Sequence, residues 1–307
     1  MLAPGARLYT EMLTAKALIH GDAEGLLAFD ASEHPVALQL GGSEPEELAR
    51  AARLGARAGY DEINLNVGCP SDRVQSGRFG ACLMLEPGRV AACVSAMREA
   101  VRIPVTVKTR IGVDENDHYG FLRDFAGGVI EAGCDALMVH ARIAWLEGLS
   151  PKQNREVPPL RYEHVHRLKR DFPDTPIIAN GGITSVADAL AQLDSCDGVM
   201  LGRAAYHTPW LLAELHSELS GDPLPEASRV VERLAELVRA QLAQGGRVAH
   251  VTRHALGLFQ GRPGARRWRR ILSEGAHRSD ADEALLHRAF AAVRYPGRTV
   301  ARPSARA

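Results

Sequence analysis

Cys69 is the residue of this sequence best placed to do chemistry. It follows the apolar run EINLNV (62–67) on a loop bounded by glycine and proline, where a side chain can be directed at a ligand. The alternative is a small buried apolar side chain, which is how the other four cysteines fit their helix or strand patterns. The five cysteines contain no CxxC pair and lie in no dense cluster with histidine. We therefore expect neither a disulfide framework nor a metal site.

Polar side chains also lie within or directly after the other apolar runs. A single Gln, Asn or His at such a position often only satisfies a loop backbone. Lys108 differs, because it is one of only four lysines and lies inside the run VTVKTRI, where a buried charge without a partner is costly. If the runs are strands of one parallel barrel, these side chains meet at one edge of it. The candidates are Gln39, Asn66, Lys108, Arg110, His140, Arg142 and Asn180.

Two glycine-rich segments suit a phosphate group. They are NGG (Asn180, Gly181, Gly182) and LGR, which ends in Gly202 and Arg203. Glycines let the backbone approach an anion, helix N-termini supply N–H donors, and an arginine adds a charge-assisted hydrogen bond. Ordinary tight turns between strands and helices are the alternative. Because no GxGxxG follows a strand, a Rossmann dinucleotide site is not indicated.

Seven apolar runs supply the strands that must position these residues. Near-continuous Val, Ile and Leu runs separated by amphipathic helices indicate parallel strands in βα units. We therefore predict an α/β fold, a TIM (β/α)8 barrel with seven strands visible and the first strand absent; an open doubly wound sheet is the alternative. The runs are Leu8–Met12, Val36–Leu40, Glu62–Val67, Val105–Ile111, Ala136–Ala141, Pro176–Gly181 and Gly198–Arg203.

Three helices of this region carry start signals. Capping-box spacing and a threonine before a proline are both typical of helix N-termini. The predicted pairs are Ser43 with Glu46 for the helix Glu44–Ala58, Ser185 with Asp188 for Val186–Leu193, and Thr208 with Pro209 for Pro209–Leu219.

The segment SGDPLPEAS (220–228) reads as a linker, and only helical patterns follow it. We predict a barrel domain over 1–220, a small helical bundle over 228–294 and a disordered tail over 295–307. Asp280 and Glu283 have capping-box spacing at the start of the last helix. The predicted helices are Ser228–Gln244, Val248–Gln260, Pro263–Glu274 and Asp280–Val293.

The charge of the chain is zero overall and uneven along its length. Residues 247–307 carry 13 arginines and 4 acidic residues, net +9, so residues 1–246 carry 24 basic and 33 acidic residues, net −9. Such asymmetry points to a nucleic acid or a membrane surface. In PGARRWRRILSE, Arg266, Arg269 and Arg270 lie nearly on one side with Trp268 between them, as in a phosphate-contacting face. Alternatively, Trp268 packs inside the bundle and the arginines merely face water.

The sequence argues against several locations. It contains no run of 18 apolar residues, so we expect no membrane span. The start MLAPGARLYTE lacks the basic and apolar regions of a secretory signal. With an odd number of scattered cysteines, the reducing cytoplasm is the expected location.

Taken together, the motifs strongly resemble those of the flavin-dependent tRNA-dihydrouridine synthases, over residues 8–293. The resemblance is carried by GCPS with GAC, by VKTR and by VHAR, at consistent spacing. NREVPPLRY (154–162) and LGLFQGRPGARRWRRILSEGAH (256–277) look like the A-type subfamily.

The resemblance implies a flavin-binding TIM barrel with bound FMN, a helical tRNA-binding domain and NADPH as the electron donor. The implied reaction reduces the D-loop uridines at tRNA positions 20 and 20a to 5,6-dihydrouridine. A hydride passes from N5 of FMN to C6 of the uracil, and Cys69 gives a proton to C5 from the opposite face. A protonated thiol suits that general-acid role. The target base must leave its stack to reach a barrel mouth.

Site residues are carried over by the same resemblance, and we also expect a monomer. Those that look like FMN contacts are Gln39, Lys108 and His140, with Asn180, Gly181, Gly182, Gly202 and Arg203 at its phosphate. Those that would hold the uracil and adjoining phosphates are Asn66, Arg110 and Arg142, and those that resemble tRNA-orienting positions are Arg155, Pro158, Arg266 and Arg269.

One feature departs from the family. Its members begin with a strand carrying Ala-Pro-Met before the segment that corresponds to LYTEM. Here Ala3-Pro4 stands only five residues before Tyr9, so it is not that motif. We therefore expect the first βα unit to be missing and the barrel to have an open seam between its first and last strands.

Two other functions remain as alternatives. One is an FMN-dependent reductase of free pyrimidines, against which the basic helical segment and NREVPPLRY argue. The other is a truncated, catalytically dead tRNA-binding remnant, which the absent first strand would produce.

Overall fold

The computed structural model describes residues 1–71, 74 and 77–294, and these form two compact units. One unit comprises Gly5–Ile183 and Ala187–Leu201. The other comprises Met1–Pro4, Thr184–Val186 and the described residues from Gly202 onward. Residues 202–220, which our predicted ranges assign to the barrel domain, fall in the second unit. The functional domain boundaries stay a prediction, and the predicted disordered tail lies outside the described residues.

The first unit is built on one parallel sheet. Its strands follow the order β1-β3-β4-β5-β6-β7-β8, and β2 also pairs with β3. In the described part of the chain β1 and β8 do not pair with each other, so the sheet is open between them. The strands are β1 Leu8–Tyr9, β2 Leu13–Thr14, β3 Val36–Gly41, β4 Glu62–Val67, β5 Val105–Arg110, β6 Ala136–His140, β7 Ile177–Asn180 and β8 Gly198–Met200.

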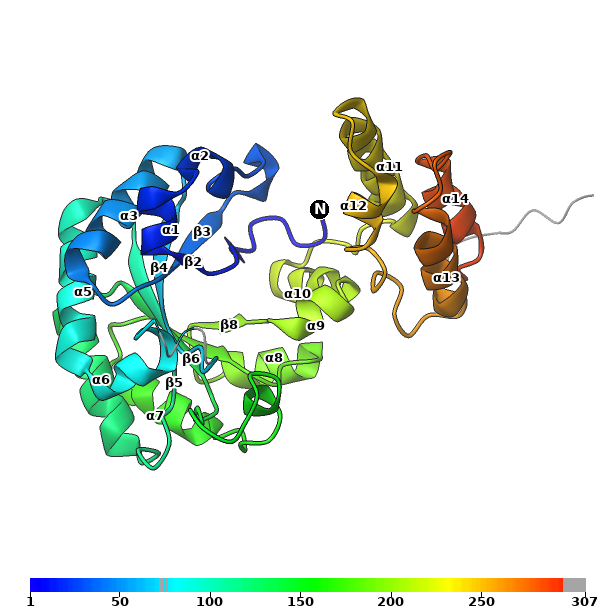
Figure 1. Ribbon diagram of the computed structural model, residues 1–307. Coiled ribbons are helices and arrows are strands. Elements are labelled where there is room, and N and C mark those ends of the chain that lie inside the picture. The colour runs from blue at the N-terminus through cyan, green and yellow to red at the C-terminus, as the bar shows by residue number, and fades with distance from the viewer. Residues whose placement is uncertain (72–73, 75–76, 295–307) are drawn as a thin grey trace, which may run out of the picture. The chain divides into compact units, whose positions relative to one another are not determined.

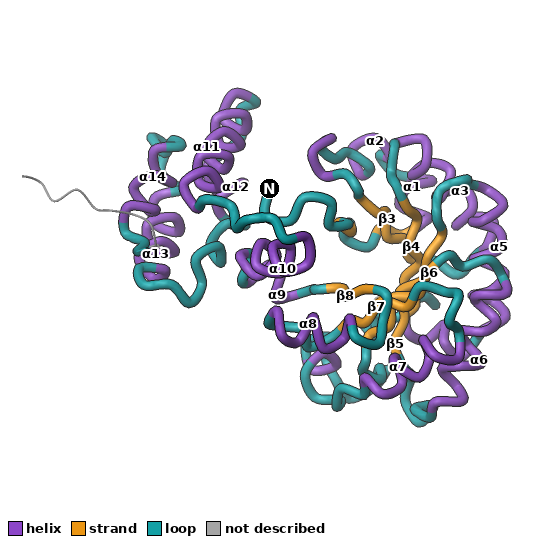
Figure 2. The backbone as a smooth tube through the Cα atoms, turned by 180° about the vertical axis from the view of Figure 1, so that it is seen from behind, coloured by secondary structure: helices purple, strands orange, loops and turns teal. Residues whose placement is uncertain are grey.

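Helices cover the outer side of this sheet, as expected of a TIM-type α/β fold. Figure 1 shows α3, α5, α6 and α7 following one another along that side, and Figure 2 shows the strands inside this layer from behind. The predicted fold class is therefore confirmed. The helices are α1 Ala15–His20, α2 Ala23–Leu26, α3 Pro45–Ala58, α5 Pro87–Ala100, α6 Tyr119–Glu131, α7 Tyr162–Asp171 and α8 Val186–Leu193, with 3-10 turns at Ala31–Glu33, Gly80–Leu85 and Gln153–Arg155.

Side chains along the strands alternate between the helix layer and the inside of the barrel. On β4, Ile63, Leu65 and Val67 are fully buried in the core that includes the helices. Glu62, Asn64 and Asn66 alternate with them and therefore face the interior. The same alternation on β5 sends Thr106, Lys108 and Arg110 inward. The barrel interior thus receives polar groups from every second position of runs that look apolar as a whole.

Two predicted strands differ in the structure. The run Leu8–Met12 contains only the two-residue strand β1; β2 follows the run at Leu13–Thr14, and both strands pair with β3. The last strand ends at Met200 rather than Arg203, because Gly202 adopts the N-cap position of helix α9. Gly202 and Arg203 therefore begin a helix and do not end a strand.

Three predicted helix caps are wrong. Helix α3 has Glu44 at its N-cap with no side-chain capping bond, and Pro45 supplies the first turn without needing a donor. Helix α10 begins at Trp210 after Pro209, so Thr208 does not cap it. Helix α14 begins only at Ala284, and Asp280 pairs instead with Arg278 (Oδ1 to Nε, 2.9 Å). The predicted bounds of α8 are confirmed.

All the regular secondary structure described in the second unit is helical. Phe259 and Trp268 are buried at its centre, with ring centroids 4.8 Å apart in an edge-to-face arrangement. The indole N–H of Trp268 donates to the carbonyl of Ala255 (3.0 Å), so this tryptophan packs inside the bundle. The predicted helix Val248–Gln260 is shorter than expected and ends at Thr252. The helices are α9 Arg203–His207, α10 Trp210–Ser220, α11 Ala227–Ala243, α12 Val248–Thr252, α13 Ala265–Gly275 and α14 Ala284–Ala291.

Candidate active site

Cys69 is anchored at both ends of its backbone. Its N–H donates to Oδ1 of Asn66 (3.0 Å), which also accepts the N–H of Gly68 (3.0 Å). Its carbonyl accepts the N–H of Ala81 (2.9 Å). The thiol donates to the hydroxyl of Ser71 (3.5 Å between Sγ and Oγ), and the residue is half-buried. The backbone of Cys69 is therefore held in place, and the residue is partly exposed.

Gly80, the glycine of the GAC motif, explains the spacing between GCPS and GAC. Gly80 has a positive φ of +77°, which an L side chain rarely adopts. A Cβ on it would meet the carbonyl oxygen of Cys69 at 2.5 Å and the side chain of Val74 at 2.3 Å. Only glycine lets this turn approach the Cys69 backbone closely enough for the bond from Ala81.

Asn66 and Gln39 are joined by a buried hydrogen bond. Nδ2 of Asn66 donates to Oε1 of Gln39 (2.8 Å), and Nε2 of Gln39 donates to Oδ1 of Asn64 (2.8 Å). Because Oδ1 of Asn66 already accepts two backbone N–H groups, this side chain has only its second Nδ2 hydrogen left for a ligand. It can therefore contact an acceptor, such as a carbonyl oxygen of a pyrimidine.

Lys108 lies beside Asn66 in the sheet, as its Cα partner on the neighbouring strand. Burial first, and then the positive charge of Arg110, lower the pKa of Lys108 to about 8. Within the part of the chain that the structure describes, its ammonium makes no hydrogen bond or ion pair. A buried ammonium without a counter-charge favours a negatively charged ligand beside it.

Arg110 holds three loops together. Its Nε donates to the carbonyl of Gly68 (2.8 Å), and its Nη1 donates to those of Ile143 (2.9 Å) and Asn154 (3.0 Å). Its side chain is buried, and this burial lowers its pKa to about 10. Much of its donor capacity is thus used on the loop of Cys69 and on the segment between β6 and α7.

His140 and Asn180 continue the same edge of the sheet. They are Cα partners of each other, and His140 also faces Arg110. Nδ2 of Asn180 donates to the carbonyl of Met200 (2.7 Å), which ties β7 to β8. Gly181 has a φ of +107°, and a Cβ on it would meet the His140 ring at 2.4 Å. The two glycines after β7 thus bring bare backbone against the histidine.

Arg142 and Pro158 are also brought together. Nη1 of Arg142 donates to the carbonyl of Pro158, and Pro158 is a buried residue. Arg155, on the 3-10 turn that precedes Pro158, is exposed. The other predicted site residues fall in the helical unit. Arg203 opens α9, and Arg266 and Arg269 lie on α13, where Arg266 is exposed and Arg269 donates to Oε1 of Gln260.

Sequence reasoning missed two buried residues that organise the site. Asn154 is fully buried, and its side chain accepts the N–H of Trp145 (2.8 Å) and donates to the carbonyls of Trp145 (2.8 Å) and Leu149 (3.1 Å). Glu62 is buried at the start of β4 and bonds to Thr106 on β5. The only signal for Glu62 was its position two residues before Asn64 and four before Asn66.

The arrangement combines a directed thiol, donors for pyrimidine-type acceptors and a cationic interior. Such a set can place a proton on a carbon of a base whose carbonyl oxygens are held by N–H groups. Among the described residues, no group of three or more His, Cys, Asp or Glu side chains could hold a metal ion. None of the described helices is both long and apolar enough to span a membrane.

Comparisons with known proteins agree with this chemistry. A family model described as dihydrouridine synthase matches residues 2–294. The chain is 57% identical to a tRNA-dihydrouridine(20/20a) synthase of Xanthomonas campestris over 289 residues, 94% of this chain and 86% of that protein. Proteins of the same name from Shewanella oneidensis and Vibrio cholerae are 55% and 53% identical, over 95% and 96% of this chain and 88% and 91% of theirs.

Proposed function

Because this chain belongs to the dihydrouridine synthase family, we propose that it reduces uridines of tRNA to 5,6-dihydrouridine. The relatives named above carry the positions 20 and 20a in their names, and we assign the same two D-loop uridines to this chain. The structural observation that carries the proposal is Cys69, whose backbone is fixed at both ends while the residue stays partly exposed.

FMN fits the residues present. The Lys108 ammonium, which burial destabilises, suits the anionic edge of a reduced flavin. Gln39, through its second Nε2 hydrogen, and His140 would hold the same ring system. The phosphate of FMN would be held by Asn180, Gly181 and Gly182, and the resemblance adds Gly202 and Arg203 to this set. The positive φ values of Gly181 and Gly182 supply the bare backbone that a phosphate needs. When bound, FMN supplies the hydride that adds to C6 of the uracil, and NADPH is the reductant we assign to it.

Cys69 supplies the proton in this proposal. Its S–H bond breaks as a C–H bond forms at C5 of the uracil, and solvent returns the proton to the thiolate. Asn66 keeps the Cys69 amide in place and offers one N–H to a carbonyl oxygen of the base. Arg110 holds the Cys69 loop through the Gly68 carbonyl. The cationic groups Arg110 and Arg142 would attract the adjoining phosphates.

The exposed arginines of the chain would bind the rest of the tRNA. Arg155 is exposed in the barrel unit, beside Pro158, and Arg266 is exposed on α13 in the helical unit, where Arg269 is partly buried. We propose that these residues orient the tRNA, as the resemblance implies. We also propose that the protein acts as a cytoplasmic monomer.

The substrate class can be tested with the purified protein, FMN and NADPH. We expect dihydrouridine in an unmodified tRNA transcript, measured by mass spectrometry of its nucleosides, and no dihydrouracil from free uracil. Product from free uracil but not from tRNA would instead support a reductase of free pyrimidines. Protein that stays colourless when FMN is added, and that binds tRNA without forming product, would support a dead tRNA-binding remnant.

A further inference from the structure

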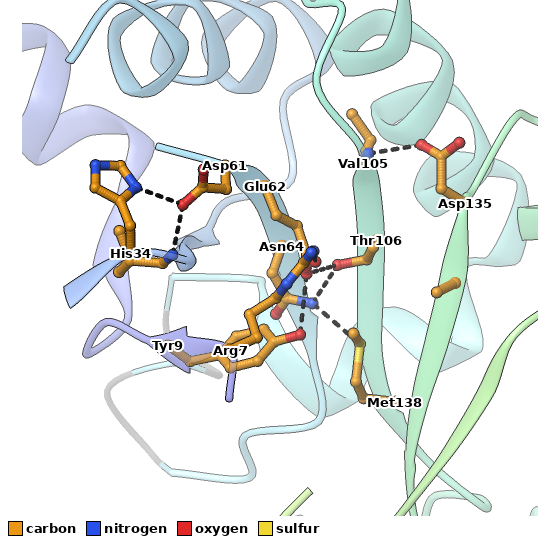
Figure 3. A network of polar contacts seen from close by, with 12 residues as sticks. Arg7, Tyr9, His34, Asp61, Glu62, Asn64, Val105, Thr106, Asp135 and Met138 are labelled. Atoms are coloured by element: carbon orange, nitrogen blue, oxygen red, sulfur yellow. Dashed lines mark hydrogen bonds and ion pairs between the residues drawn. The ribbon is translucent and has the colours of Figure 1, made fainter. Parts of the chain in front are cut away.

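A continuous chain of side-chain hydrogen bonds crosses the inside of the barrel and ends at Cys69. It begins at the carboxylate of Glu62, which is 1% exposed. Figure 3 shows Arg7, Tyr9 and Thr106 all directed at this carboxylate. Arg7 forms an ion pair with it, the Tyr9 hydroxyl donates to Oε1 (3.1 Å), and the Thr106 hydroxyl donates to the same oxygen (2.5 Å).

The bonds that follow all run in one direction. Because the Thr106 hydroxyl gives its proton to Glu62, its oxygen accepts from Nδ2 of Asn64 (2.8 Å). Oδ1 of Asn64 then accepts from Gln39, and Oε1 of Gln39 accepts from Asn66, each at 2.8 Å. At the end, Oδ1 of Asn66 accepts the N–H groups of Gly68 and Cys69.

The direction is set from the Glu62 end. A carboxylate has acceptor sites only, so every neighbour must donate to it. Burial, followed by the charge of Glu62, raises the pKa of Tyr9, which keeps that hydroxyl protonated as a donor. If the Asn66 amide were turned over, its NH2 group would face the N–H groups of Gly68 and Cys69. Two donors facing each other in a buried site would be left unsatisfied.

We propose that Glu62 is a positioning residue for Cys69, which it orients through the side chains of Thr106, Asn64, Gln39 and Asn66. The partners of this chain come from β3, β4 and β5, and Thr106 and Glu62 are 44 positions apart in the sequence. The importance of these hydrogen bonds for turnover rests on the proposed function, in which Cys69 is the proton donor. Chains of hydrogen bonds in a low-dielectric interior strengthen one another, so the orientation of Asn66 depends on every link.

Two substitutions at Thr106 separate the hydrogen bond from packing. Thr106→Val keeps the volume and removes the hydroxyl, whereas Thr106→Ser keeps the hydroxyl and removes a methyl group. If Thr106 acts only through packing, the serine variant should differ more from the wild type, in amide exchange and in turnover, than the valine variant. The proposal predicts the opposite order. Thr109→Val is the matched control, because Thr109 is equally buried on the same strand and lies on the opposite face, outside the chain.

The first readout is the amide of Cys69 itself. Protein labelled with 15N-cysteine gives one signal for each of its five cysteines, and Cys69→Ser assigns the signal of interest. We expect the exchange of this amide with solvent to be about 10-fold faster in Thr106→Val than in the wild type, since the bond to Asn66 is weakened. Thr106→Ser and Thr109→Val should stay within about 2-fold of the wild type.

The second readout is turnover on tRNA. We expect Thr106→Val to lower kcat about 10-fold and to leave KM for tRNA within about 2-fold, because a misplaced catalytic group costs rate rather than binding. Unchanged exchange in Thr106→Val, or a serine variant as damaged as the valine variant, would overturn the proposal. Wild-type exchange in Glu62→Met, which offers no oxygen to accept from the Thr106 hydroxyl, would overturn it too.

These results are separate from a failure of the proposed function. Wild-type turnover in Cys69→Ala would remove the proton-donor role. The exchange of the Cys69 amide in the Thr106 variants would still decide whether the hydrogen bonds that start at Glu62 position Cys69. Lost turnover in Cys69→Ala together with wild-type behaviour of Thr106→Val would keep the proposed function and reject the positioning role of Glu62.

Discussion

Cys69 is positioned by its backbone, with Asn66 on one side and Ala81 on the other. The loop therefore holds the Cys69 backbone in place, and the residue is half-buried. Cys82 offers a contrast thirteen residues further on, because its thiol donates to the carbonyl of Phe79 (3.2 Å) and burial raises its pKa. The two cysteines share a segment, and the proposed mechanism uses only Cys69 as the general acid.

We predict that Cys69→Ala abolishes dihydrouridine formation and leaves the oxidation of NADPH by the flavin protein intact. The reason is that only the proton to C5 depends on the thiol. Stopped-flow absorbance of the flavin and mass spectrometry of the tRNA measure the two steps separately. Cys82→Ala should retain both steps, and equal turnover in the two variants would rule out the assignment of Cys69.

The lowered pKa of Lys108 predicts that the stability of the protein depends on pH. Its pKa is about 8 in the folded protein and close to 10.4 for an unfolded lysine, so between these values the unfolded chain binds more protons. The cost of burying Lys108 is therefore complete below pH 8 and decreases as the pH rises above it.

Without FMN, Lys108→Met should accordingly be more stable than the wild type at pH 7. That advantage should shrink as the pH approaches 10. Urea unfolding at several pH values measures it, with exposed Lys152→Met as the control. A difference in stability that does not change with pH would contradict the burial of a charged Lys108.

At the scale of elements, the segment between β6 and α7 is organised around one side chain. Asn154 has no exposed surface and bonds to the backbone of Trp145 and Leu149, while its own carbonyl accepts from Arg110. The segment that carries Arg155 and Pro158 thus depends on Asn154 for its shape, and on Arg110 for its connection to the Cys69 loop.

We predict that Asn154→Ala lowers the free energy of unfolding by about 2–4 kcal/mol, because it leaves buried N–H and carbonyl groups without partners. Cleavage between residues 144 and 160 by a protease should become faster. Gln153→Ala removes a neighbouring amide that is exposed, and should cost under about 1 kcal/mol. Equal losses in the two variants would show that the buried bonds of Asn154 are not what holds the segment.

The strands could be predicted because their outward side chains are Val, Ile and Leu at every second position, and the helix layer buries them. The caps failed at Ser43, Thr208 and Asp280, because residue type and spacing do not fix the local backbone when a proline or an arginine offers a competing arrangement. Glu62 was missed because its partners lie on other strands, and the pairing register is set by the whole sheet.

At the scale of the whole molecule, the sequence divides its charge between two regions. Residues 247–307 carry +9 and the rest −9. In the helical unit, Trp268 is buried while Arg266, Arg267 and Arg270 of the same helix are exposed. Trp268 therefore packs inside the bundle, as the alternative interpretation predicted, and a phosphate-contacting role of the exposed arginines stays a prediction.

We predict that Arg266→Ala with Arg269→Ala weakens tRNA binding and flattens its salt dependence. Each lost phosphate contact should reduce the slope of log K against log salt by about 1. The control is Arg229→Ala with Arg233→Ala on α11, whose guanidinium groups pair with Glu226 and Glu236. Filter binding at several salt concentrations measures both, and identical slopes would remove α13 from the tRNA interface.

The central claim is that this chain makes dihydrouridine at defined positions of tRNA. The most direct test is a nucleotide-by-nucleotide map of dihydrouridine, by mass spectrometry of nuclease fragments, in an unmodified transcript with uridines at positions 20 and 20a. After incubation with the protein, FMN and NADPH, we expect a mass increase of two hydrogens at positions 20 and 20a and at no other uridine. No such increase anywhere in the transcript, or an increase only at other positions, would contradict it.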